Sequence, residues 1–114
     1  MEDMEDNKLI EGLMKIYEES DPKFADFSIN CQNGQIVKSH KLILAIRSEY
    51  FDGLFRLEPN KTSIDLSDFS FEVVKAVIQS MIVINEEKLV EVGVIEVIQL
   101  ADFLQMEHLI KVSF

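Results

Sequence analysis

The dipeptide Asn33-Gly34 constrains the fold of this 114-residue chain more than any other feature. It follows residues 26–32, in which apolar and polar residues alternate as in a strand with one buried face. The apolar positions are Phe27, Ile29 and Cys31. Both central residues of a two-residue hairpin turn need positive φ, which Asn and Gly adopt readily. The pattern predicts an antiparallel hairpin whose second strand covers about 35–39.

Most of the remaining chain has helical periodicity. Helices are predicted over 6–19, 41–46 and 48–56, after Ser70, from Gly93 to 104, and in a short final stretch around 109–112. Ser48 and Ser70 are placed to cap the helices that follow them. Residues 62–66 alternate and predict a third strand, and the β-branched residues of 83–92 predict a short strand near 88–91. The order predicts one α+β domain with a small three- to four-stranded sheet beside about five to six helices.

The charge of the chain limits the classes of ligand that it can bind, and its cysteine content indicates a cellular compartment. The 21 acidic and 11 basic residues give a net charge of −10, and the basic residues are scattered singly. Nucleic acid and anionic membranes are therefore excluded as direct ligands, because both need clustered basic residues. A single cysteine rules out an internal disulfide and indicates a reducing, intracellular location, nucleus or cytoplasm. No apolar run approaches the ~18 residues of a membrane span.

No set of residues predicts catalysis. His40 and His108 lie far apart and fit no metal-binding spacing. Cys31 has two interpretations, a small buried side chain or a nucleophile, and its place on the apolar side of a strand favours burial. The four glycines are dispersed and form no phosphate-binding loop. The chain is expected to be non-enzymatic, with no cofactor, metal or small-molecule substrate.

Three segments carry a family resemblance. HKLILAIRSEYFDGLF at 40–55 and LADFLQM at 100–106, with DFSI at 26–29, resemble the BTB (POZ) domain over about residues 24–112. The helix at 6–19 is similar to the extra N-terminal helix of the dimerising BTB subgroup. The resemblance implies a BTB fold with an N-terminal dimerisation helix at 1–20 and a core at 24–114. The chain departs from the family pattern at 82–84, where Ile-Val-Ile replaces the usual Tyr-Thr-Gly.

The resemblance implies a homodimer, and the apolar stripe of the N-terminal helix supports it. The expected interface residues are Leu9, Ile10, Leu13, Met14, Ile16, Tyr17 and, from the helix that starts at Lys41, Leu44. An isolated helix of this length is marginal in water, so the stripe must dock on something. Two dockings are open: onto a second copy, or onto the helix's own domain.

In dimerising BTB domains an acidic residue at the start of the first strand and a basic residue after the histidine line a charged pocket. Asp26 and Lys41 match these positions in residue type. The resemblance therefore implies a charged pocket at Asp26 and Lys41. The alternative is two unrelated exposed charges.

The resemblance also implies a surface that faces a cullin scaffold. Its residues are Asp52, Phe55, Leu57, Glu58, Met106 and His108. Cullin-binding members carry a hydrophobic-x-Glu motif in a longer loop; here Leu57 supplies the apolar residue, but position 59 is proline. Phe55 has a second interpretation, since its helical spacing from Phe51 also fits the core.

The implied function is a homodimerising protein-interaction module, the BTB part of an adaptor for a cullin-3-type ubiquitin ligase. The alternative is a BTB scaffold or transcriptional-regulator oligomerisation domain that binds a regulatory peptide instead of a cullin. The partners expected are a second copy of the chain and a cullin or such a peptide. The apolar residues near the C-terminal end favour a domain taken from a longer protein.

Overall fold

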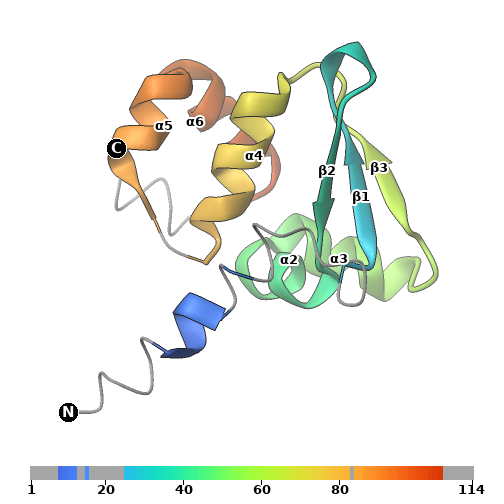
Figure 1. Ribbon diagram of the computed structural model, residues 1–114. Helices are drawn as coiled ribbons and strands as arrows, with labels where there is room; N and C mark the ends of the chain where they lie inside the picture. Colours follow the sequence, from blue (N-terminus) through green and yellow to red (C-terminus); the bar gives the residue numbers. More distant parts are fainter. Residues whose placement is uncertain (1–7, 13–14, 16–24, 83, 107–114) are drawn as a thin grey trace.

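The computed structural model describes residues 8–12, 15, 25–82 and 84–106 and places a small sheet beside a group of helices (Figure 1). Residues 8–12 are helical, in agreement with the predicted N-terminal helix; most of the rest of 6–19 lies outside the described residues. The other elements are β1 (Phe27–Asn30), the 3-10 turn η1 (Gln32–Gly34), β2 (Ile36–Ser39), α2 (Lys41–Arg47), α3 (Glu49–Leu57), β3 (Ser63–Asp65), α4 (Phe71–Ser80), α5 (Glu86–Val92) and α6 (Val94–Phe103). The α+β class is as predicted.

The three strands form one sheet in the order β2-β1-β3. β1 pairs antiparallel with β2, with Ile29 opposite Val37, and parallel with β3, with Ile29 beside Ile64. Alternate residues of β1 and β2 are buried, as the period of two requires. The inner face therefore carries apolar side chains, and the outer face carries residues such as Ser28 and Lys38.

The hairpin turn predicted at Asn33-Gly34 is confirmed. Asn33 has φ 61° and Gly34 has φ 74°, so both central residues are left-handed. The Gln35 N–H donates to the Gln32 carbonyl across the turn at 3.2 Å. The alternation of the strands and the chemistry of the turn thus agree, which fixes the register of the hairpin.

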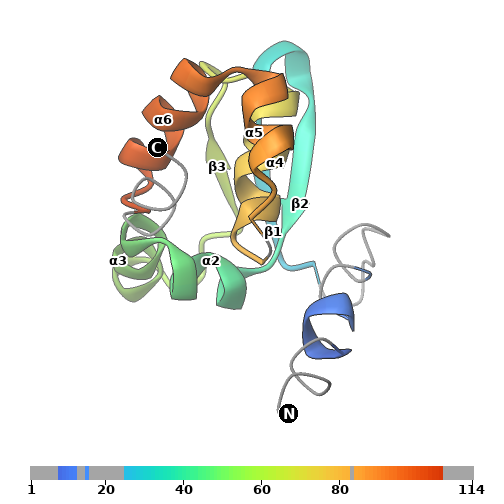
Figure 2. The same cartoon turned by 90° about the vertical axis from the view of Figure 1, so that its left-hand side faces the viewer.

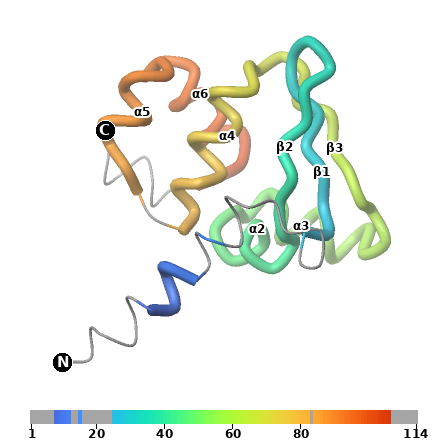
Figure 3. Tube along the Cα trace, in the orientation of Figure 1, coloured from blue at the N-terminus to red at the C-terminus, as the bar shows by residue number. Residues whose placement is uncertain are grey.

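The core lies between the inner face of the sheet and α4. Figure 1 shows α4 between β2 and α5, and Figures 2 and 3 show α2 and α3 at one end of the sheet. α4 packs against β2, α5 and α6, and α2 packs against α3. The largest fully buried side chains come from every layer: Ile29, Leu44, Phe51, Val73, Val74, Ile78, Met81, Leu89, Leu100, Leu104 and Met106.

The predicted helix caps are present. The Phe51 N–H donates to the Ser48 side-chain oxygen at 3.1 Å, and the Val73 N–H donates to that of Ser70 at 3.2 Å. Each serine satisfies a donor that the first turn of a helix leaves unpaired.

The short strand predicted near 88–91 is wrong, because this stretch belongs to α5. The Asn85 side chain accepts from the Lys88 N–H at 3.1 Å and caps the helix, and Glu86 and Glu87 occupy its first turn, where acidic residues are favourable. Leu89 is buried and Gly93, with φ 124°, ends the helix. Capping and burial outweigh the β propensity of Val90 and Val92. Within the described ranges the sheet has three strands, the lower of the two predicted numbers.

Among the described residues, every helix is too short or too polar to cross a lipid bilayer.

Candidate functional site

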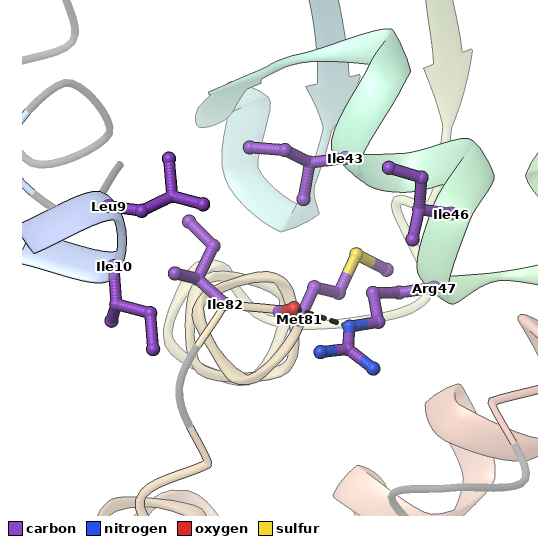
Figure 4. A pocket seen from close by; sticks show the side chains of 7 residues that line it. All are labelled: Leu9, Ile10, Ile43, Ile46, Arg47, Met81 and Ile82. Atoms are coloured by element: carbon purple, nitrogen blue, oxygen red, sulfur yellow. Dashed lines mark hydrogen bonds between the residues drawn. The ribbon is translucent and has the colours of Figure 1, made fainter. Parts of the chain in front are cut away.

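An apolar pocket of about 260 Å³ opens between the helical segment 8–12, α2 and the end of α4 (Figure 4). Its apolar lining is Leu9, Ile10, Ile43, Ile46, Met81 and Ile82, and the remaining lining residue is Arg47. The lining comes from segments far apart in the sequence, so the pocket exists only in the folded chain.

α2 presents apolar side chains on two faces. Leu44 is buried in the core, whereas Leu42 is 72% exposed and Ile46 is 69% exposed. Leu42 and Ile46 are four residues apart and therefore neighbours on the helix surface. Residues this apolar rarely stand together in water without a partner, and the face they form continues the pocket lining at Ile46.

Arg47 is the cationic side chain of the pocket. Its Nε–H donates to the Met81 carbonyl oxygen at 2.9 Å, as the dashed line in Figure 4 marks. Met81 is the C-cap residue of α4, where helix carbonyls lack partners within the helix and the dipole favours a positive charge. The contact joins the last turn of α2 to the end of α4 and holds the guanidinium beside the apolar lining.

The predicted dimer residues fall into three groups. Leu9 and Ile10 line the pocket and are exposed. Leu44 has no exposed surface, so the structure places it in the protomer core rather than at an interface. Leu13, Met14, Ile16 and Tyr17 lie outside the described residues.

Asp26 and Lys41 are brought together, but not as a side-chain ion pair. The Asp26 carboxylate accepts from the Lys41 backbone N–H at 2.8 Å. The Lys41 ammonium group instead donates to the Pro59 carbonyl at 2.9 Å and lies 5.5 Å from the centroid of the Phe55 ring. The Asp26 carboxylate and the Lys41 ammonium group therefore contact different partners.

The residues of the implied cullin-facing surface separate into exposed and buried ones. Leu57 is 84% exposed at the end of α3, and Glu58 follows it. Asp52 is half-buried and pairs with Arg56 at 3.1 Å. Met106 is fully buried and so is not part of a surface. His108 lies outside the described residues.

Phe55 is half-buried and belongs to an aromatic cluster. Its ring centroid lies 5.1 Å from that of Phe27 and 5.6 Å from that of Phe51. The core interpretation of Phe55 therefore holds for most of its ring. A neighbouring aromatic pair that the sequence did not single out is Tyr50 with Phe103, at 4.9 Å, and Phe103 is 46% exposed.

The titratable groups of the described residues form no second candidate site. Within the described ranges no cluster of His, Cys, Asp and Glu has a geometry that holds a metal ion. Cys31 is buried, its Sγ–H points to the Ile29 carbonyl at 3.6 Å, and burial raises the pKa of its thiol. The buried interpretation of Cys31 is therefore confirmed.

Sequence reasoning missed five of the lining residues: Ile43, Ile46, Arg47, Met81 and Ile82. The signal available for the first three was an unusually apolar helix, KLILAIR, that has more large side chains than one core-facing stripe needs. Met81 and Ile82 carried no such signal.

Comparison with known proteins gives one family and one fold. The family model for the BTB/POZ domain matches residues 14–113. The BTB domain of human gigaxonin superposes with a TM-score of 0.66 at 24% identity, covering 90% of this chain and 81% of that one. The BTB domain of zebrafish PATZ1 gives 0.69 at 22% identity, covering 93% and 85%. Comparison with curated protein sequences returns no significant match.

Proposed function

The chain belongs to the BTB/POZ domain family of protein-interaction modules, and from this premise we propose that it forms a homodimer through its N-terminal segment and α2. The proposed dimerisation segment is 1–20 and the proposed core is 24–114. The N-terminal apolar stripe of one copy would cover the exposed face of α2 in the other. A two-fold arrangement is economical because each copy gives and receives the same segment.

The observation that carries the proposal is the exposed apolar set around the pocket. Leu9 is 64% exposed, and Leu42 and Ile46 are more exposed still. Burying a large aliphatic side chain stabilises a structure by about 2 kcal/mol. Covering the side chains of this set and of the N-terminal stripe would supply several times that amount, enough to offset part of the entropic cost of association.

The first experiment measures mass in solution. Sedimentation velocity of the full chain is expected to give a dimer at micromolar concentration. Ile46→Asp is expected to give a monomer with an unchanged circular dichroism spectrum, since a charge in a covered apolar face is costly. Ile95→Asp is the matched control: Ile95 is 73% exposed, but on α6. It should leave the dimer intact.

Removal of residues 1–20 tests the role of the N-terminal segment. The shortened chain is expected to be monomeric. A dimer of unchanged stability would contradict exchange of this segment, and a dimer that survives Ile46→Asp would contradict the use of α2.

We further propose that the end of α3 docks a cullin-3-type scaffold, so that the domain serves as a ubiquitin-ligase adaptor. Leu57 supports this docking site as an exposed apolar anchor flanked by the charged residues Arg56 and Glu58. The nearby pair of Tyr50 and Phe103 offers further apolar surface, with Phe103 the more exposed.

A binding measurement decides between the adaptor and its alternative. The cullin-3 N-terminal region is expected to bind the parent, to lose at least about tenfold in affinity on Leu57→Asp, and to be unaffected by Val90→Asp on α5. Val90 is also exposed and apolar. No binding to the parent would favour the alternative, a scaffold or transcriptional-regulator domain whose dimer presents a groove to a peptide.

A further inference from the structure

Gly53 is an exposed residue in the middle of α3, where no contact among the described residues requires a glycine. Its backbone is helical, and a methyl group in place of one Gly53 hydrogen would meet no side chain or neighbouring segment of the described residues within 4 Å. Alanine is the better helix former at such a position, because glycine loses more backbone freedom on folding. The glycine therefore lowers stability without a reason inside the protomer, and a partner that needs the space supplies one.

The four surface neighbours of Gly53 all have large side chains. Neighbours on a helix surface lie three and four residues away, which gives Glu49, Tyr50, Arg56 and Leu57. Tyr50 is half-buried and Leu57 is 84% exposed, whereas Glu49 and Arg56 are exposed charged residues. Gly53 therefore forms a notch in the surface of α3, with apolar side chains on one side and charged side chains on the other.

Contacts within the protomer hold two of these neighbours in place. The Tyr50 ring centroid lies 4.9 Å from that of Phe103, at the end of α6, which Figure 2 shows next to α3. The Arg56 Nε–H donates to the Asp52 carboxylate at 3.1 Å, so the charge of Arg56 is matched within α3. None of the ion pairs among the described residues involves Glu49. The notch thus has a positioned apolar side and one acidic group that a partner can match.

We propose that the notch at Gly53 takes a large apolar side chain from a helix of the scaffold that docks on α3, and that a basic residue of the same helix pairs with Glu49. The inference rests on the proposed docking of a cullin-3-type scaffold and names a contact within it. Tyr50 and Leu57 are separated by about 10 Å along the helix axis, which leaves room for one large side chain between them. Packed helices insert their side chains between those of the other helix in this way, and a glycine at the contact lets the two backbones approach closely.

The charges of α3 and of the whole chain favour a basic residue in the partner. α3 has Glu49 and Asp52 in its first turn and Glu58 at its C-cap, against Arg56 as the basic residue of its last turn. The whole chain has a net charge of −10, so it attracts a positively charged segment and repels an acidic one. Because Glu49 is exposed, we expect its pair to contribute more to the choice of partner than to total affinity.

A size series at position 53 tests the notch, with the cullin-3 N-terminal region as the probe. Gly53→Ala and Gly53→Leu both introduce better helix formers, so both should raise the melting temperature of the free domain. Both should nevertheless weaken binding, by at least about threefold for alanine and at least about tenfold for leucine, because each fills space that the partner's side chain needs. Without such a contact, a leucine beside Leu57 would enlarge the apolar surface and tighten binding. Unchanged or tighter binding of Gly53→Leu would overturn the proposal.

The chain offers a matched control for the glycine substitution. Gly12 is also an exposed helical glycine at which an added methyl group has open space, but it lies in the N-terminal segment. Gly12→Leu should leave the affinity for the cullin-3 region unchanged. An equal loss for Gly12→Leu and Gly53→Leu would show that the effect does not arise at the notch, and would contradict the proposal.

Glu49→Gln tests the basic residue of the partner, because it removes the charge and keeps the shape of the side chain. We expect a loss of about two- to fivefold in affinity at low salt, the range of an exposed ion pair. The difference from the parent should vanish at high salt, which screens exposed charges. Equal affinities of the two proteins at low salt would contradict a basic residue at this position.

The outcomes separate a failure of the notch from a failure of the docking itself. If the parent does not bind the cullin-3 region, the proposed docking fails first and the contact at Gly53 fails with it. If the parent binds and Leu57→Asp weakens binding while Gly53→Leu does not, the docking site stands and the notch proposal alone is wrong.

Discussion

The carboxylate of Asp26, just before β1, accepts a 2.8 Å hydrogen bond from the backbone N–H of Lys41, the first residue of α2. His40, the N-cap residue of α2, makes no side-chain capping bond, so a residue fifteen positions upstream satisfies this end of the helix. The negative charge also lies at the end of the helix where its dipole favours it.

We expect Asp26→Ala to destabilise the domain by about 1–2 kcal/mol, the usual cost of removing a helix cap. Asp26→Asn should cost less, because its amide oxygen still accepts the bond while the charge is lost. Urea unfolding followed by circular dichroism measures both. Asp68→Ala, at an exposed acid in the turn after β3, is the control. Equal midpoints for Asp26→Ala and the parent would contradict the role of this contact.

Ser48 joins α3 to the end of α6. Its hydroxyl donates to the Leu104 carbonyl at 2.6 Å and accepts from the Phe51 N–H at 3.1 Å, and the residue is buried. Ser48→Ala removes a cap and leaves the Leu104 carbonyl with only the longer bond from the Tyr50 N–H, at 3.4 Å, so we expect a loss of about 2 kcal/mol.

Ser70→Ala is the matched comparison, because Ser70 caps α4 in the same way but is only half-buried. It should cost about 1 kcal/mol. Thermal unfolding of the two variants measures the difference. Equal losses would mean that the bond from Ser48 to Leu104 contributes nothing.

The sequence predicts local features of this fold better than the orientation of its surfaces. The left-handed turn at Asn33-Gly34 and the caps at Ser48 and Ser70 depend on neighbouring residues, so residue types alone identify them. The sequence predicts a strand in place of α5 because the β-branched residues of this stretch favour a strand, whereas Asn85 favours the start of a helix. The burial of Leu89 decides between the two, and that burial depends on tertiary packing.

The candidate site was predicted less well. α2 is apolar on nearly all sides, so periodicity does not tell which side faces the core, and Leu44 was assigned to the interface although Leu42 and Ile46 are the exposed residues. The family resemblance implied a charged pocket at Asp26 and Lys41, but not that the bond goes to a backbone N–H.

Gln105 shows how Met106 becomes buried. Gln105 has φ 55°, and after α6 the Met106 N–H bonds to the Ala101 carbonyl while the Gln105 N–H bonds to that of Asp102. These two bonds form a Schellman motif, which reverses the chain direction after α6, and Met106 is fully buried.

A left-handed conformation costs a non-glycine residue about 1–2 kcal/mol, part of which glycine loses again through its freedom in the unfolded chain. We therefore expect Gln105→Gly to stabilise the domain by about 0.5–1 kcal/mol. Gln105→Ala keeps the cost of the left-handed conformation. It should therefore change the free energy of unfolding by no more than a few tenths of a kcal/mol. A glycine variant that unfolds at a lower urea concentration than the parent would show that the Gln105 side chain contributes more than its conformation costs.

Cys31 makes stability depend on alkaline pH. Burial is the main cause that raises the pKa of its thiol, whereas in the unfolded chain the thiol titrates near its ordinary value of about 8.5. Above that pH the unfolded state loses its proton first, so the native state binds more protons and stability falls as pH rises, by at most about 1.4 kcal/mol per pH unit. Well below the pKa of the unfolded-state thiol, both states are protonated and this group contributes almost no pH dependence. Cys31→Ala lacks the thiol, so its free energy of unfolding should fall less between pH 8 and pH 10 than that of the parent. At pH 7 the variant is expected to be less stable than the parent, because its side chain is smaller. Parallel curves for the two proteins would mean that the thiol has the same pKa in the folded and unfolded states.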